Sequence, residues 1–197
     1  MIATGIFGGS FNPIHNGHIG LALRLLERCH LDEIWFVVSP QNPLKTRGSL
    51  LDDATRLRLV RAALASHPRL RACDYEYHLP VPSYTYDTLM AMQGDFPDRR
   101  FLLLMGADNW HNFHRWYRHD DIIRRFHIII YPREGTVIDG DTLPPNAHIV
   151  ETPLYNISST MIRQRIHRGE SISGLLPECV EKIITDEALY SHNADGQ

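Results

Sequence analysis

The chain has 197 residues, 43% hydrophobic and 22% charged, which is ordinary for a globular protein and sufficient for one domain with a substantial core. A formal net charge of −3 argues against nucleic acid or an anionic membrane as the main partner, because both favour a basic protein surface. The three cysteines form no C-x-x-C pair and no apolar run is long enough for a membrane helix, so we expect a cytoplasmic protein with reduced thiols.

Strand-like and helical patterns alternate along the chain. Apolar runs predict strands over residues 2–7, 34–38, 72–77, 101–105, 127–131 and 147–150, and helical spacing predicts helices over residues 19–29, 54–66, 84–92, 158–168 and 178–189. This alternation predicts an α/β fold with a single doubly wound parallel sheet, which holds its ligand at the carboxyl ends of the strands. We expect one domain over residues 1–190, a loose tail over 191–197 and a surface loop over 135–146.

The second predicted helix carries three arginines. Leu57, Val60 and Leu64 repeat at helical spacing and predict its buried stripe. Because Arg56, Arg58 and Arg61 lie largely off this stripe, we expect them to form a solvated face.

A glycine turn and two histidines separate the first predicted strand from the first helix. Gly8, Gly9 and Ser10 end the strand, and His15 and His18 lie three positions apart where the helix starts. A helix N-terminus offers unpaired N–H groups and positive potential, while glycine can adopt positive φ and lie close to a ligand. Each histidine can donate an N–H to a phosphoryl oxygen. The junction therefore predicts a phosphate site; the alternative is that one histidine caps the helix or binds a structural metal.

The run over residues 8–18 resembles the G-x-F-x-P-x-H-x-G-H signature of the nucleotidyltransferase superfamily, whose members attach a nucleotide monophosphate to a phosphate-bearing acceptor. The resemblance implies that Phe11 belongs to the ATP site with the glycines, Ser10 and the two histidines. Asn12 stands where Asp is commoner in the superfamily, which weakens any role for a charge at this position.

A second candidate phosphate element occupies residues 156–163. Its hydroxyls and one arginine can hold phosphoryl oxygens at the start of a helix. The segment resembles the I-S-S-T-x-x-R element that contacts ATP phosphates in the same superfamily, which implies ATP contacts for Ile157, Ser158, Ser159, Thr160 and Arg163. The alternative is that the serine pair only caps the helix.

Three further segments resemble bacterial nicotinate mononucleotide adenylyltransferases: residues 43–45, residues 83–89, and residues 106–109 followed by 116–117. Nicotinate is a flat ring with a carboxylate, so its site needs a stacking face and N–H donors. Trp116 can supply the face, and the resemblance implies backbone donors near Thr85 and Tyr117 in a pocket that prefers acid over amide. Tyr84 completes this group, with core packing as the alternative for Tyr84 and Trp116.

Two assignments in these segments keep simple alternatives. Lys45 can reach a phosphate or be a lone surface lysine, and Asp108 can bind the nucleotide or cap a helix. Gly106, just before Asp108, is assigned to the ATP site with it.

The resemblance implies adenylyl transfer from ATP to nicotinate mononucleotide, giving nicotinate adenine dinucleotide and pyrophosphate. An acceptor phosphate is largely ionised at neutral pH, so catalysis needs positioning and charge stabilisation, for which His15, His18 and Arg163 are the candidates. Mg²⁺ is expected to arrive with ATP, without a metal site built from protein side chains. Alternatives are transfer to nicotinamide mononucleotide or phosphopantetheine, and a nucleotide-binding regulator without turnover; the oligomeric state is not predicted.

Overall fold

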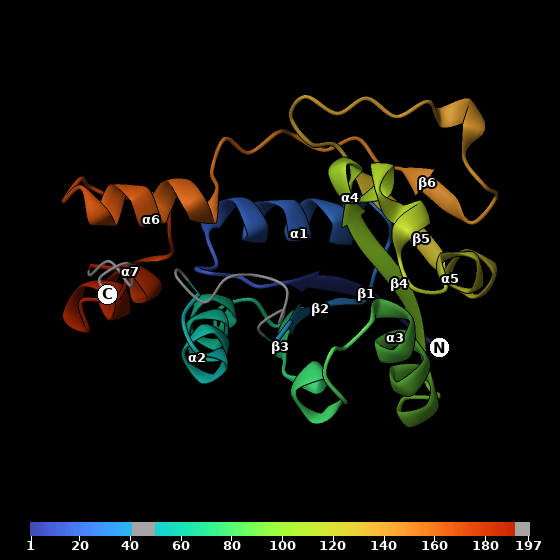
Figure 1. The fold of residues 1–197 in the computed structure, drawn as a ribbon, viewed down its shortest axis with the longest axis horizontal. Coiled ribbons are helices and arrows are strands. Elements are labelled where there is room, and N and C mark those ends of the chain that lie inside the picture. Colours follow the sequence, from blue (N-terminus) through green and yellow to red (C-terminus); the bar gives the residue numbers. More distant parts are fainter. Residues whose placement is uncertain (41–49, 192–197) are drawn as a thin grey trace.

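The computed structural model describes residues 1–40 and 50–191. Six parallel strands form one sheet in the order β3-β2-β1-β4-β5-β6 (Figure 1). The strands are β1 (Ile2–Gly9), β2 (Glu33–Val38), β3 (Leu70–Cys73), β4 (Arg99–Gly106), β5 (His127–Tyr131) and β6 (Ala147–Ile149). This order confirms the doubly wound, Rossmann-like sheet. Successive strands are added on one side of β1 as far as β3 and then on its other side from β4 onwards. The topological switch point therefore lies between β1 and β4, where such sheets bind ligands.

The helices in the described residues are α1 (Asn16–Arg28), α2 (Asp53–Leu64), α3 (Thr85–Asp95), α4 (Ala107–His111), α5 (His119–Arg125), α6 (Ser159–His167) and α7 (Glu178–Asp186). The same described ranges contain the short 3-10 helices η2 (Tyr75–His78), η3 (Phe113–Arg115) and η4 (Gly140–Thr142), the last within the predicted surface loop. None of the helices in the described part of the chain combines the length and apolarity needed to cross a bilayer.

The sheet separates two hydrophobic layers. In β2, Ile34, Phe36 and Val38 face one layer, whereas Trp35 and Val37 face the other, because successive strand residues point to opposite faces. Helices α1, α2, α6 and α7 cover the first layer, and α3, α4 and α5 cover the second. Burial on both faces explains why these strands are nearly continuous apolar runs.

One predicted element is wrong, and two short helices have no counterpart in the sequence prediction. The strand expected over residues 72–77 is β3, which pairs with β2 only through Leu70–Cys73 and is followed by the 3-10 helix η2. The alternating aromatic residues after Cys73, Tyr75 and Tyr77, belong to η2, and the Tyr77 hydroxyl donates to the Asp53 carbonyl. Helices α4 and α5 were not expected, since segments of five and seven residues carry too little periodicity to detect.

The last two helices begin where their cap residues predict. The Ser158 hydroxyl accepts the Met161 N–H at 3.1 Å and starts α6, and Pro177 precedes α7. Helix α7 buries Val180 and Ile184 and packs against α2. Of the expected tail, residues 192–197 lie outside the described residues.

Candidate functional site

Two histidines stack at the start of α1, directly after the loop that follows β1. The ring centroids of His15 and His18 are 3.6 Å apart with an interplanar angle of 23°. The backbone N–H of His15 donates to Nδ1 of His18 at 3.2 Å. A neutral imidazole that accepts at Nδ1 carries its proton on Nε2. His18 therefore retains one N–H that it can donate to a ligand.

Both imidazoles are held in the neutral form. Burial lowers the pKa of His15 to about 4, and the nearby Arg133 acts in the same direction. Burial, followed by His15 and Arg133, lowers the pKa of His18 well below its ordinary value. A bound phosphate would oppose these effects, because an adjacent anion stabilises the imidazolium.

The loop over residues 10–15 joins β1 to the helix that holds His18, and we call it the histidine loop. It adopts positive φ at Phe11, where φ is 44°. Gly8 and Gly9 form the extended end of β1, so the expectation of positive φ at these glycines is wrong. A Cβ on Gly9 would lie 3.1 Å from the Phe11 ring, which packs edge-on against Phe7 and His18. The glycine thus lets an aromatic ring fold under the loop, and the Phe11 side chain is buried.

Helix α6 reaches the same loop. The Ser159 hydroxyl donates to the Pro13 carbonyl at 2.8 Å, and Nη1 of Arg163 donates to the Asn12 carbonyl at 2.7 Å. Nη2 of Arg163 also contacts the Thr160 hydroxyl at 3.3 Å. The structure therefore brings the two predicted phosphate elements together, with Ser159 and Arg163 holding the loop backbone.

A cavity of about 450 Å³ lies between these elements. Both histidines, Asp108, Ile157 and Ser158 line it. The other residues predicted for the ATP site are not among its described lining residues: Gly8, Gly9, Ser10, Phe11, Gly106, Ser159, Thr160 and Arg163. Its volume is within the range of small-molecule sites. The cavity collects residues from the carboxyl ends of several strands, as expected for this fold.

Arg133 is a cavity residue that the sequence interpretation missed. It follows β5 by two residues and lines the same cavity as the histidines, and its Nε lies 3.7 Å from Oδ1 of Asp108. A Cβ on Gly106 would lie 2.3 Å from Oδ1 of Asp108 and 2.9 Å from Nε of Arg133. A side chain at position 106 would therefore force the Asp108 and Arg133 side chains to shift. An arginine just past the carboxyl end of a strand was the available signal.

The aromatic residues proposed for the acceptor gather at the start of α3. The rings of Tyr84 and Tyr117 are 4.8 Å apart and remain 46% and 49% exposed, so core packing does not explain Tyr84. With Thr85 and Trp116 they line a cavity of about 460 Å³. Lys45 lies outside the described residues.

A smaller cavity of about 170 Å³ adjoins this acceptor group. Thr85 and Trp116 line both cavities, and the smaller one extends to Gly8 and Gly9 at the end of β1. The acceptor group is therefore connected to the strand that leads into the histidine loop.

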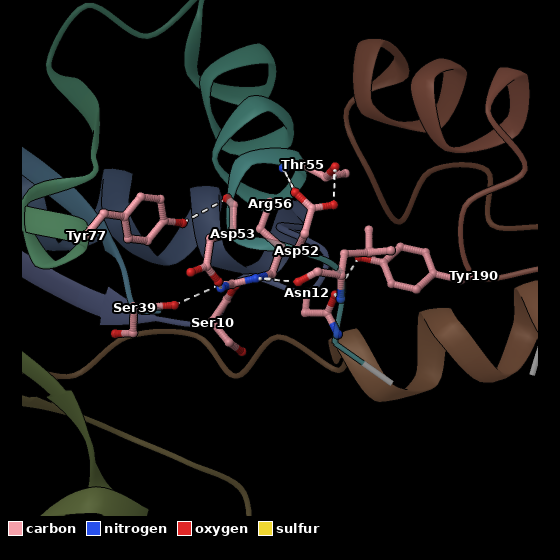
Figure 2. A network of polar contacts seen from close by, with 10 residues as sticks. Ser10, Asn12, Ser39, Asp52, Asp53, Thr55, Arg56, Tyr77 and Tyr190 are labelled. Carbon is pink, nitrogen blue, oxygen red and sulfur yellow. Dashed lines mark hydrogen bonds and ion pairs between the residues drawn. The ribbon is translucent and has the colours of Figure 1, made fainter. Parts of the chain in front are cut away.

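Arg56 lies beneath the histidine loop and is completely buried, so its predicted place on a solvated face is wrong (Figure 2). Its guanidinium donates to the carbonyls of Leu51 at 3.0 Å, Ser10 at 2.7 Å and Ser39 at 2.9 Å, and pairs with Asp53. These contacts join the ends of β1 and β2 to α2. Helical spacing could not reveal them, because the partners lie on other elements.

Two residues from distant parts of the chain contact Asn12 in the loop between β1 and α1. The Tyr190 hydroxyl donates to Oδ1 of Asn12 at 2.7 Å, and the Leu51 N–H donates to the same oxygen at 3.3 Å (Figure 2). Asn12 thus uses its side-chain carbonyl oxygen as an acceptor from two other segments. This gives a structural role to the position at which the superfamily more often has Asp.

Known proteins resemble this chain over nearly its whole length. The sequence model of the family described as cytidylyltransferase-like matches residues 6–165. A probable nicotinate-nucleotide adenylyltransferase of Bacteroides fragilis is 46% identical over 193 residues, covering 96% of each chain. A protein of the same name from Bacteroides thetaiotaomicron is 47% identical over 171 residues, covering 87% of this chain and 85% of its own.

Solved structures agree on the fold. The nicotinic acid mononucleotide adenylyltransferase of Plasmodium falciparum, complexed with NaAD, superposes with a TM-score of 0.83 at 21% identity and covers 99% of this chain and 100% of its own. At this identity the similarity is evidence for the fold alone.

Proposed function

This chain belongs to the nicotinate-nucleotide adenylyltransferases of the cytidylyltransferase-like family, and from that premise we propose its reaction. It transfers an adenylyl group from ATP to nicotinate mononucleotide and produces nicotinate adenine dinucleotide and pyrophosphate, a late step of NAD biosynthesis. The observation that carries this conclusion is the 46% identity, over 96% of both chains, to a relative bearing that name.

The reaction is a displacement at the α-phosphorus of ATP. An oxygen of the acceptor's phosphate forms a bond to this phosphorus while the bond to the β-phosphate bridging oxygen breaks, and that oxygen leaves with pyrophosphate. The acceptor phosphate is already ionised at neutral pH, so the enzyme must mainly align the two substrates and stabilise the charge that grows on the leaving group.

ATP occupies the 450 Å³ cavity in this proposal. His18 donates its Nε2 proton to a phosphate oxygen, and His15 stacks beside it. Arg163 is the third proposed catalytic residue, and its positive charge acts on the phosphates together with the histidines. Its hydrogen bond to the Asn12 carbonyl holds it beside the histidine loop. Arg133, which lines the same cavity, adds a positive charge for the triphosphate. The remaining ATP contacts are proposed for Gly8, Gly9, Ser10, Phe11, Gly106, Asp108, Ile157, Ser158, Ser159 and Thr160.

Nicotinate mononucleotide occupies the aromatic cavities in this proposal. Trp116 provides a stacking face, and Thr85 begins α3, whose first-turn N–H groups favour a carboxylate. An amide would place its NH₂ against the same donors, which supports the preference for acid over amide. Lys45, Tyr84 and Tyr117 complete the proposed acceptor group, with Lys45 proposed from the sequence alone.

Mg²⁺ enters this proposal with ATP as part of the substrate. In residues 1–40 and 50–191, no three His, Cys, Asp or Glu side chains gather as a metal site. We propose that phosphate oxygens and water coordinate the ion for the most part, and Asp108 and Glu134 are the carboxylates that line the cavity. A cytoplasmic location, supported by three free cysteines, and a single domain over residues 1–190 remain part of the proposal.

The direct test measures pyrophosphate release from Mg·ATP with nicotinate mononucleotide, nicotinamide mononucleotide or phosphopantetheine as the acceptor. We expect the highest kcat/KM with nicotinate mononucleotide. Release only with another acceptor would overturn the acceptor assignment, and nucleotide binding without release would support the regulator alternative.

A further inference from the structure

Glu76 is a buried carboxylate in the wall of the smaller acceptor cavity. It lies in η2, directly after β3, and is 8% exposed. The cavity also includes Thr85 and Trp116, the proposed carboxylate-binding and stacking residues. Among the described residues that line it, Glu76 alone is acidic or basic. The wall of the acceptor cavity therefore holds one buried carboxyl group, which the catalytic scheme does not use.

Neutral groups solvate this carboxylate. The Thr88 hydroxyl donates to Oε1 of Glu76 at 3.0 Å. Burial raises the pKa of Glu76, while hydrogen bonds from Ser39, Thr88 and Ser83 lower it and only partly offset burial. Burying a carboxylate beside hydroxyls, without a cationic partner among them, leaves its charge incompletely compensated. A cation bound in the cavity would supply the missing compensation.

The proposed acceptor carries such a cation. The ring nitrogen of nicotinate mononucleotide is bonded to ribose, so the ring is a quaternary pyridinium with a permanent positive charge. A cationic ring also gains from stacking on Trp116, because an aromatic face attracts positive charge. With the acceptor's carboxylate at the start of α3, the cavity provides one group for each charge of the zwitterionic ring.

We propose that Glu76 is the counter-charge for the pyridinium ring of the acceptor and a determinant of selectivity for cationic ring nucleotides. This inference rests on the proposed function and adds a residue that recognises the charge of the ring, separate from the groups that recognise its carboxylate. Glu76 acts on substrate binding, so its removal changes acceptor affinity more than the rate of phosphoryl transfer.

The experiment compares two acceptors by isothermal titration calorimetry. One is nicotinate mononucleotide, and the other is its carbon isostere, a 3-carboxyphenyl riboside 5′-phosphate, whose ring has the same shape but no charge. Glu76→Gln keeps the volume and an acceptor oxygen for the hydroxyls while removing the charge. We expect this variant to bind nicotinate mononucleotide about tenfold more weakly, since a single partly buried charge pair reaches this magnitude. Its affinity for the isostere should change by less than about twofold.

Glu178→Gln is the matched control, because Glu178 is an exposed carboxylate in the first turn of α7 and lines neither the ATP cavity nor the acceptor cavities. It should leave both affinities unchanged. Equal weakening of both acceptors by Glu76→Gln would overturn the proposal and assign Glu76 a structural role, and unchanged affinity for nicotinate mononucleotide would overturn it as well.

The wild-type protein keeps the proposal testable if Glu76→Gln does not fold. If the wild-type protein binds the two acceptors with equal affinity, the proposal that Glu76 is the counter-charge is overturned. If it binds the isostere at least tenfold more weakly, the proposal is supported. Turnover separates the two hypotheses: wild-type protein that adenylylates nicotinate mononucleotide but shows no dependence on ring charge refutes only the inference about Glu76. Absence of adenylylation with any acceptor refutes the proposed function itself.

Discussion

Replacing Arg56 by methionine tests whether the buried network beneath the histidine loop stabilises the fold and the site. Arg56 is completely buried, and its guanidinium donates to three backbone carbonyls on separate segments and pairs with Asp53 (Figure 2). Methionine retains most of the apolar stem but has no donor. The substitution therefore removes these contacts without leaving a large cavity.

The structure sets the expected magnitude. Breaking a buried charge pair by removing one partner costs about 3–5 kcal/mol, and a buried carbonyl left without a donor costs about 1–3 kcal/mol. Asp53 is 39% exposed and the carbonyl oxygens can recruit some water, which reduces the sum. We expect Arg56→Met to lower the free energy of unfolding by about 3–5 kcal/mol.

Urea denaturation at pH 7 measures this change from the transition midpoint at constant slope. Arg58→Met is the matched control: Arg58 lies on the same helix, but its side chain is 46% exposed and pairs with Glu187 on the surface. The control should unfold like the wild type. The KM for ATP should rise in Arg56→Met, because the Ser10 carbonyl loses its anchor beside the histidine loop. A loss below about 1 kcal/mol would refute the assigned role of the network.

Three further outcomes follow from the site. His18→Ala should lower kcat about 10²-fold or more with little change in the circular dichroism spectrum, as for loss of a transition-state donor, and near wild-type turnover would exclude His18 from catalysis. Acidification from pH 7 to pH 4 should destabilise the fold, because unfolded histidines take up protons near pH 6.5 while His15 in the folded state resists protonation down to about pH 4. His15 alone should lower the free energy of unfolding by about 3 kcal/mol between pH 7 and pH 4. His15→Gln should remove this contribution from the pH dependence measured by urea titrations. Gly106→Ala should raise the KM for ATP several-fold, since its Cβ would displace Asp108 in the cavity, whereas Gly94→Ala in α3 meets no atom within 4 Å and should leave KM unchanged.

Local sequence patterns were sufficient for the sheet and for both phosphate elements. Alternation of apolar runs with helical spacing determines a parallel doubly wound fold, because parallel strands need crossovers and burial on both faces. The strand-turn-helix junction before His15 and the serine cap of α6 are likewise local, since a cap bonds within one helical turn. The family resemblance was also visible in contiguous motifs.

The errors at residues 72–77 and at Arg56 arose where distant partners decide the structure. Aromatic alternation alone cannot separate β3 from η2, because the division depends on pairing with β2 and on the Tyr77 contact with Asp53. An arginine off the apolar stripe is expected to be exposed unless carbonyls from other elements surround it, as they do around Arg56.

The sequence by itself determined the architecture and the superfamily and predicted which residues hold phosphate, since each depends on spacing within a short segment. Only the tertiary structure decided which of them share a cavity. It placed Ser159 and Arg163 on the backbone of the histidine loop, and it brought Arg133 and Glu76 to the walls of the two substrate cavities. Burial and charge compensation depend on neighbours that the fold assembles, and no local pattern encodes them.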